Sequence, residues 1–143
     1  MSGYRELLAA AEADYHDDLF KEAHIKYGQA MSAGDEREYY CRRMRGICSR
    51  RVGEQRLDKA VEHPDESVLF LNQAAKWLAK SEANLDSALE NAPGSERGEM
   101  RLEQARTEET IARFMEMSGG DPHRRFAAAR SLRQEASELL AHS

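Results

Sequence analysis

The sequence has few residues that favour β-strands: valine and isoleucine each occur three times and threonine twice among 143 residues. Alanine and glutamate, which both favour helices, occur 21 and 18 times. The composition therefore predicts an all-α fold, and the length suits a single helical domain over residues 1–143.

Long apolar runs are also missing. No stretch approaches the roughly 18 consecutive apolar residues that a membrane-spanning helix needs. No basic segment followed by an apolar one stands after Met1, so the sequence gives no sign of a secretory leader. We therefore expect a cytoplasmic protein that does not bind membranes.

Cysteine and large aliphatic residues are scarce as well. Cys41 and Cys48 are the only cysteines, and seven residues of helix separate them by about 10 Å, which is too far for a disulfide. Leucine, isoleucine and valine total 19, so the core should be thin and rich in alanine. A thin core favours an apolar surface that a partner, or a second copy in a homodimer, completes.

Apolar residues recur at spacings of three and four along the chain, which predicts about six amphipathic helices. The first two, near residues 3–16 and 20–33, should form an antiparallel hairpin around a short acidic turn. A third should begin after a cap at Asp35 and lose its phase at Gly53, where we expect a kink or a fresh start.

The fourth helix, over residues 65–91, should be a long central helix. Its expected buried seam has heptad spacing and consists of Val68, Leu71, Ala75, Leu78, Glu82, Leu85, Leu89 and Ala92. Five more residues broaden this seam into a wide apolar face that suits contact on two sides, namely Phe70, Ala74, Trp77, Ser81 and Ala88. A fifth helix with a polar, frayed first half should follow a cap at Ser95. A sixth should begin with Pro122 at its first position.

The first helix pair resembles a tetratricopeptide repeat. Five residues of the second helix have the spacing of that repeat's second helix, and Leu7 and Ala11 stand where its first helix has a large and a small residue. The five residues are Phe20, Ala23, Tyr27, Ala30 and Met31. A similar pattern occurs in the microtubule-interacting and transport domain. The resemblance covers about 30 residues and implies a peptide- or protein-binding module without catalysis.

The resemblance is local. One repeat length after Ala30 the sequence has Pro64, and a proline at a mid-helix position argues against a regular second repeat. We therefore expect an array of antiparallel helical hairpins that resembles the family in its first unit.

The third helix has a basic run with six arginines and a single acid, Glu54, so its local charge is +5 in a chain of net charge −5. The arginines are Arg42, Arg43, Arg45, Arg50, Arg51 and Arg56. Guanidinium groups suit carboxylate or phosphate partners. The alternative is a solvated face that pairs with the acidic first hairpin of the same chain.

We expect this run to bind an acidic or helical segment of a partner protein, together with an apolar aromatic surface. The predicted binding residues are Arg42, Arg43, Arg45, Arg50, Arg56, Tyr40, Phe70 and Trp77. Nucleic acid is the alternative partner, which the net charge of −5 disfavours. Arg51 lies in the inward arc of its helix as Glu82 does in the seam, so an inward ion pair between these two is a further hypothesis.

Catalytic and metal-binding patterns are weak. Cys41 and Cys48 share the phase of the inward residues, where a thiol lacks the exposure that a nucleophile needs. Glu12, His16 and His24 bring carboxylate and imidazole groups to neighbouring helices, but no further ligand can be named. We therefore expect no enzyme activity, cofactor or bound metal.

Overall fold

The computed structural model describes residues 3–34 and 37–142, and these residues form six α-helices and two short 3₁₀ turns without a β-strand. The predicted all-α fold with six helices is thus confirmed. The elements in chain order are α1 (Tyr4–His16), α2 (Phe20–Ala33), α3 (Glu38–Glu62), η1 (Pro64–Glu66), α4 (Ser67–Glu90), η2 (Gly94–Glu96), α5 (Arg97–Met117) and α6 (His123–Ala141). The predicted cap at Asp35 lies outside the described residues.

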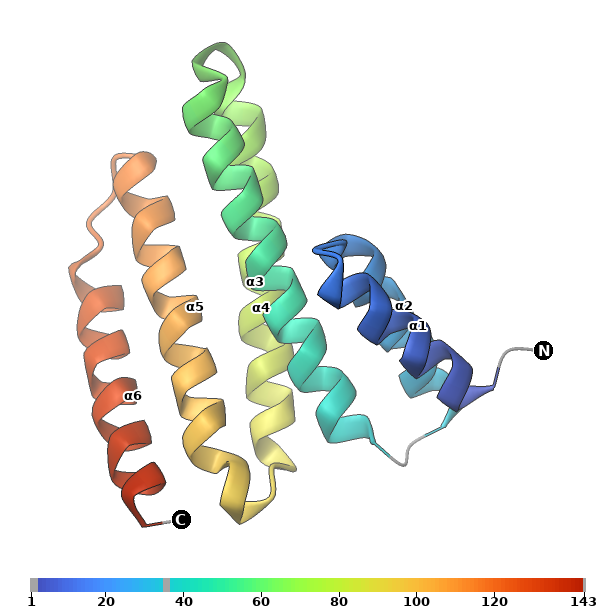
Figure 1. The fold of residues 1–143 in the computed structure, drawn as a ribbon. Coiled ribbons are helices and arrows are strands. Elements are labelled where there is room, and N and C mark those ends of the chain that lie inside the picture. The colour runs from blue at the N-terminus through green and yellow to red at the C-terminus, as the bar shows by residue number, and fades with distance from the viewer. Residues whose placement is uncertain (1–2, 35–36, 143) are drawn as a thin grey trace.

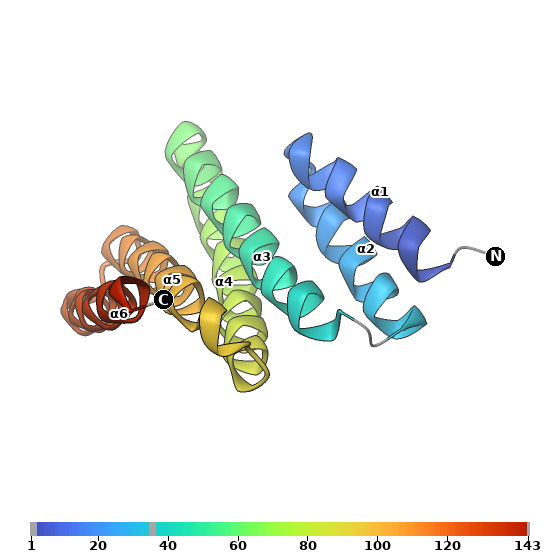
Figure 2. The same cartoon turned by 60° about the horizontal axis from the view of Figure 1, so that its bottom comes forward.

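The helices form three antiparallel hairpins that lie side by side (Figures 1 and 2). The α3–α4 hairpin is at the centre, with α1–α2 on one side and α5–α6 on the other. Its loop end projects beyond both neighbours (Figure 1). The expected long central helix is therefore one of a central pair, because α3 has 25 residues and α4 has 24.

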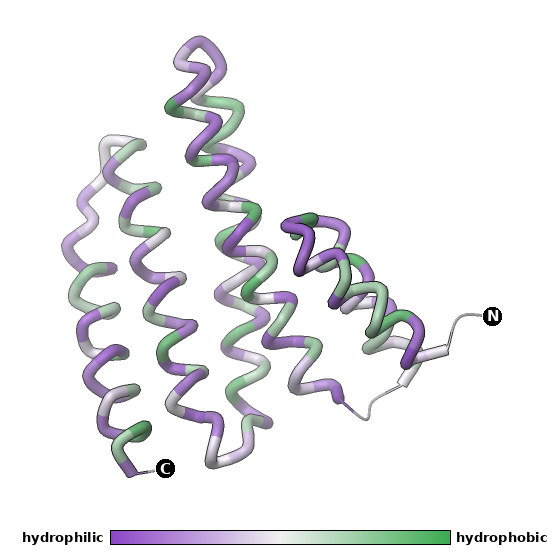
Figure 3. The backbone as a smooth tube through the Cα atoms, viewed as in Figure 1, coloured by the Kyte–Doolittle hydropathy of each residue, from purple (hydrophilic) through white to green (hydrophobic). Residues whose placement is uncertain are grey.

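Purple and green alternate along the helices in Figure 3, so each helix has polar and apolar residues in turn. Among the described residues, no helix is long and apolar enough to cross a membrane.

The first hairpin packs as its sequence pattern predicts. Ala11, Ala23 and Ala30 are fully buried together with Tyr27, and the small side chains let α1 and α2 approach closely. The larger residues of α1, among them Leu7, are partly buried against this core. The antiparallel α1–α2 hairpin and its inward face are confirmed.

The sequence pattern predicted a kink or a new helix at Gly53. No new helix begins there, since α3 continues as one helix from Glu38 to Glu62. A Cβ atom on Gly53 would lie 2.8 Å from Leu78 Cδ2, and one on Gly46 would lie 2.6 Å from Leu85 Cγ. The two glycines, seven residues apart, receive two leucines that are also seven apart on the antiparallel α4. Gly53 is thus a place of close helix approach.

The buried residues of α4 all belong to the predicted wide apolar face, but they follow its centre rather than the heptad seam alone. They are Ala74, Leu78, Ser81, Leu85 and Ala88. Val68 is 70% exposed, because it lies near the projecting loop end where no other hairpin covers α4. The hydroxyl of Ser81 donates to the Gly46 carbonyl oxygen at 2.8 Å and lies 3.0 Å from the Thr107 hydroxyl. A small polar residue therefore lets α3, α4 and α5 meet.

The ends of the third hairpin also differ in detail. Ser95 is not the cap of α5, since it lies inside the η2 turn and the helix starts at Arg97. The start of α5 is packed rather than frayed, because Gly98 is buried and a Cβ there would lie 2.9 Å from Leu140 Cγ on α6. Pro122 directly precedes α6, and the Asp121 carboxylate accepts a hydrogen bond from the His123 N–H at 3.0 Å.

Candidate functional site

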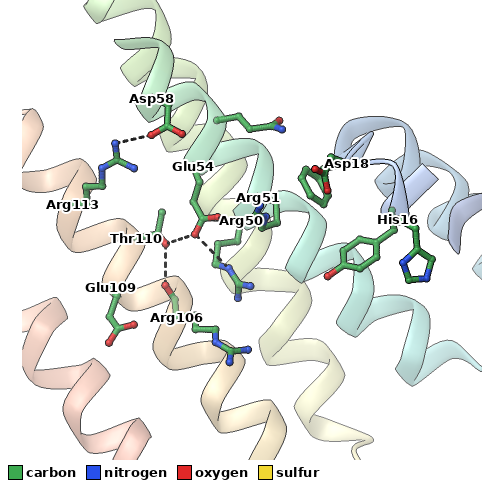
Figure 4. A pocket seen from close by; sticks show the side chains of 13 residues that line it. His16, Asp18, Arg50, Arg51, Glu54, Asp58, Arg106, Glu109, Thr110 and Arg113 are labelled. Atoms are coloured by element: carbon green, nitrogen blue, oxygen red, sulfur yellow. Dashed lines mark hydrogen bonds and ion pairs between the residues drawn. The ribbon is translucent and has the colours of Figure 1, made fainter. Parts of the chain in front are cut away.

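A groove of about 810 Å³ opens between the α1–α2 turn, α3 and α5 (Figure 4). Four of the residues that line it are arginines, namely Arg50 and Arg51 on α3 and Arg106 and Arg113 on α5. The other lining residues are Tyr15, His16, Asp18, Phe20, Glu54, Gln55, Asp58, Glu109 and Thr110. We call this site the groove.

Arg50 is buried and anchors the floor of the groove. Its Nη1 donates to Glu103 Oε2 at 2.7 Å, and its Nε lies 3.8 Å from Glu54 Oε2. Glu103 is buried too and also accepts a hydrogen bond from Arg106 Nη1. A buried guanidinium would be costly without such partners, so this network holds α5 against α3.

Three half-exposed arginines surround this floor. The side chains of Arg51, Arg106 and Arg113 are 47%, 45% and 43% exposed. Arg51 Nη1 lies 3.1 Å from Glu54 Oε1, and its guanidinium carbon lies 5.0 Å from the centre of the Phe20 ring. Arg113 Nη2 lies 2.9 Å from Asp58 Oδ1 on α3.

The ion pairs at the centre of the groove contain one guanidinium more than carboxylates, and the Asp18 and Glu109 carboxylates stand among the surrounding lining residues. The three guanidinium groups of Arg50, Arg51 and Arg106 share the carboxylates of Glu54 and Glu103. The Arg113 pair is neutral by itself, and Glu109 pairs with Arg133 of α6, whose hydrogen bonds lower the pKa of that carboxyl.

The α1–α2 turn forms the remaining wall. Asp18 has a φ of 61°, a left-handed conformation that Asp tolerates better than most residues and that closes the tight turn between α1 and α2. Tyr15 packs edge to face on Phe20, with ring centres 5.6 Å apart, and burial raises the pKa of its hydroxyl. The turn thus presents aromatic side chains beside the Arg51 guanidinium.

The predicted basic run does not form one face. Successive helix residues are rotated by about 100°, so arginines at these positions spread around α3. Of the predicted binding residues only Arg50 lines the groove. Arg42 pairs with Glu38 at 2.8 Å, and Arg43 pairs with Glu96 at 3.3 Å.

The alternative prediction was that the arginines of the basic run pair with acidic residues of the first hairpin. Their ion-pair partners lie elsewhere. Among the described residues, the ion-pair partners of the run are Glu38 and Glu54 on α3, Glu96 in η2 and Glu103 on α5. Arg45 and Arg56 have no ion pair within the described part of the chain, and the Nε atom of each is buried without a hydrogen-bond acceptor there.

The predicted aromatic residues are not gathered on one surface. The Tyr40 hydroxyl donates to Glu12 in the α1–α2–α3 core, and burial raises the pKa of Tyr40. Phe70 lies near the loop end of α4, 6.0 Å from the His63 ring and 5.8 Å from Lys59 Nζ. Trp77 packs on α2, its ring centre 5.3 Å from that of His24.

The expected inward pair of Arg51 and Glu82 is wrong. Arg51 turns into the groove, and Glu82 Oε2 instead accepts from Arg125 Nη1 of α6 at 2.8 Å. The reason is the register of α4: Ser81 faces the junction with α3 and α5, so the next residue points toward the third hairpin.

The environment of the two thiols makes them unreactive. Cys41 and Cys48 are free and fully buried, as their phase predicts. Burial raises the pKa of both and brings that of Cys48 to about 12, so neither is a thiolate at neutral pH. Over the described residues, no group of three or more histidine, cysteine or acidic side chains could hold a metal ion.

Sequence reasoning missed the contribution of α5. Arg106 and Arg113 are seven residues apart, so they lie on nearly the same helix face, and this spacing is the signal that could have found them. Their meeting with Arg50 and Arg51 depends on how two hairpins pack, which the spacing within one helix does not specify.

Comparisons with protein-family models, curated proteins and solved structures give no match to this chain. The resemblance of the first hairpin to a tetratricopeptide repeat therefore stays a prediction.

Proposed function

We propose that the chain is a non-catalytic cytoplasmic adaptor module that binds an acidic segment of a partner protein in the groove. The observation that carries this proposal is the charge at the centre of the groove, where three guanidinium groups share two carboxylates. A carboxylate from a partner would give these three guanidinium groups a third acceptor.

The positions of the arginines favour an external ligand. Arg51 and Arg106 are about half exposed, and each pairs with its carboxylate through the single nitrogen Nη1. A guanidinium has five N–H donors, so each of these side chains can hold a further acceptor. The ring of Phe20 beneath Arg51 and the buried Arg50 network fix the donors in place before binding.

The lining residues offer little for catalysis. Thr110 is the one aliphatic hydroxyl in the groove lining, and its Oγ1 lies 3.2 Å from Glu54 Oε2 and 3.0 Å from the Arg106 carbonyl oxygen. It is thus engaged by hydrogen-bond acceptors, with no imidazole among its contacts, so a role in binding is favoured over nucleophilic attack.

The test is a selection of displayed random peptides on the purified protein. We expect the selected peptides to be enriched in aspartate and glutamate relative to the starting library. The double variant Arg51→Gln and Arg106→Gln should bind them at least about tenfold more weakly, which corresponds to about 1.4 kcal/mol. Thermal unfolding would verify that the variant stays folded.

The matched control is Arg124→Gln with Arg130→Gln. These are exposed arginines on α6, and the substitutions change the net charge by the same amount. Selected peptides without acidic enrichment, or equal loss in both double variants, would contradict the proposal. Tighter binding of nucleic acid than of acidic peptides, with a steep salt dependence, would instead favour the alternative partner.

Self-association through the thin core stays a separate prediction. Light scattering of the purified protein would give its native mass and distinguish a monomer from a homodimer.

A further inference from the structure

A second region with unsatisfied positive charge lies on the α2 side of α3. The Arg45 side chain rests on Gly28 of α2, with its Nε and Cζ 3.4 Å from where a Cβ of Gly28 would stand. Arg45 is half-buried, and within residues 3–34 and 37–142 its side chain has no ion pair and its buried Nε has no hydrogen-bond acceptor. A charge partly removed from water without a partner is costly, and an external carboxylate would offset this cost.

Further positive charge lies near Arg45: burial and Arg42 of the same helix lower the pKa of Arg45, and Arg45 and Lys80 both act on His24. Lys80 Nζ on α4 lies 4.4 Å from the centre of the Trp77 ring, and the His24 ring packs edge-on against the same indole. His24 is only 5% exposed, and its Nε2 has no hydrogen-bond partner among the described residues. Burial, and then Arg45 and Lys80, lower the pKa of His24 to about 4. Arg45 and Lys80 thus create a positive potential around the neutral His24 ring.

The helices around this region supply little negative charge. The first fourteen residues of α4, 67–80, contain no acid, and α2 contains a single one, Glu22. Lys26 of α2 already pairs with Asp14 of α1 at 2.6 Å. Among the described residues, neither α2 nor α4 places a carboxylate within ion-pair distance of Arg45.

A shallow hollow of about 670 Å³ lies beside the guanidinium and is formed mainly by α2. Its lining includes the apolar side chains of Ile25, Met31 and Ala33, together with Gly28 and Arg45. Ile25 is 49% exposed, so this wall is open to a ligand. A carboxylate that enters with apolar neighbours would meet the guanidinium where part of the water is excluded, which strengthens their attraction.

We propose that the hollow beside Arg45 is a second binding site, separate from the groove, that takes an acidic side chain of a partner segment whose adjacent residues are apolar. Arg45 binds the carboxylate, Lys80 adds to the positive potential, and Ile25 and Met31 contact the apolar residues. The charge complementarity and the open apolar wall select this occupant over a purely acidic chain.

The experiment uses the groove variant, Arg51→Gln with Arg106→Gln, as the target of a second selection of displayed random peptides. The expected peptides have an aspartate or glutamate beside leucine, isoleucine, valine or phenylalanine. Adding Arg45→Gln to this variant should weaken their binding at least about tenfold. Adding Arg43→Gln instead should leave it unchanged, since this arginine of the same helix is already paired with Glu96 in η2.

A second readout uses a small probe. Hexanoate should shift the NMR signals of the Trp77 indole and the Gly28 amide in a saturable way, and hexanamide, which lacks the charge, should not. Both effects should vanish in Arg45→Gln. Failure to recover such peptides, binding that is indifferent to Arg45, or equal shifts from hexanoate and hexanamide would overturn this proposal. Because the groove is already altered in the selection, these outcomes are independent of the proposed function of the groove.

Discussion

Arg45 and Arg50 are five residues apart on α3 and belong to the same basic run, yet their environments are opposite. Arg50 is buried and holds Glu103 at 2.7 Å, whereas Arg45 is half-buried on Gly28 without an ion pair in the described part of the chain. The difference comes from the facing helix: α5 contains five glutamates and α2 contains one acid. The charge of the opposing surface, more than the run itself, decides whether an arginine stabilises the fold or stays free for a ligand.

The largest expected effect concerns the paired arginine. Glu103→Ala leaves Arg50 buried without its main partner, so we expect the free energy of unfolding to fall by about 3–5 kcal/mol in urea denaturation. Arg45→Ala should cost less than about 1 kcal/mol, because no ion pair is lost. Replacement of both charges, Arg50→Met with Glu103→Leu, should recover most of the loss. A cost for Arg45→Ala above that for Glu103→Ala would invert the comparison.

The next effect is the pH dependence that His24 brings to the region of Arg45. Its pKa is lowered from 6.5 to about 4 in the folded protein, so the unfolded chain binds more protons between these values. Stability is therefore full above about pH 6.5 and falls as the pH drops toward 4, by about 3 kcal/mol from this group.

The control for His24 is His24→Phe, which keeps a ring against Trp77 and removes the titration. The difference in unfolding free energy between wild type and variant should change by about 3 kcal/mol between about pH 7.5 and about pH 4. Parallel pH profiles would show that His24 is not held neutral by burial and its cationic neighbours.

The two glycines beside these regions should respond differently to alanine. Gly46→Ala places a Cβ 2.6 Å from Leu85 Cγ in the packed α3–α4 interface, and overpacking should outweigh the gain in helix propensity by about 1–2 kcal/mol. Gly28→Ala meets Arg45 at 3.4 Å, and this side chain is free to shift. We therefore expect Gly28→Ala to be neutral or stabilising by up to about 1 kcal/mol. Thermal unfolding of both variants would check the order.

The smallest effect is at the exposed rim of the groove. Arg113 and Asp58 are 2.9 Å apart with side chains 43% and 59% exposed, so water and salt screen their attraction. A double-mutant cycle with Arg113→Ala and Asp58→Ala should give a coupling energy below about 1 kcal/mol. A larger coupling energy would mean that this pair stabilises the fold as strongly as the buried Arg50 network does.

The sequence pattern predicts the helices well because each one depends on residues close together in the chain. The apolar spacing correctly predicted the bounds of α1 and α2 to within about one residue, and the inward cysteines follow from the phase of α3. The fresh start expected at Gly53 is wrong because a glycine can either end a helix or let a neighbouring helix approach closely. The sequence of one segment does not distinguish a helix break from the close approach of Leu78.

The groove was predictable only in part. Arg50 was named as a binding residue, but Arg106, Arg113 and Glu103 come from α5 and reach the groove through the packing of the third hairpin on α3. The predicted surface of Tyr40, Phe70 and Trp77 did not form. Tyr40 and Trp77 pack against the core of the first hairpin and α3, and Phe70 lies beside His63 near the loop end of α4. Contacts between hairpins depend on which helix faces pack together, and the apolar spacing within one helix does not determine this.

The most direct test of the central claim is an NMR titration of isotope-labelled protein with an acidic peptide selected by the wild type. We predict saturable shifts in the side-chain Nε–H signals of Arg51 and Arg106 and in backbone signals of the α1–α2 turn, with little change at Arg124 and Arg130. Shifts spread evenly over all exposed arginines, or confined to α6, would contradict binding in the groove.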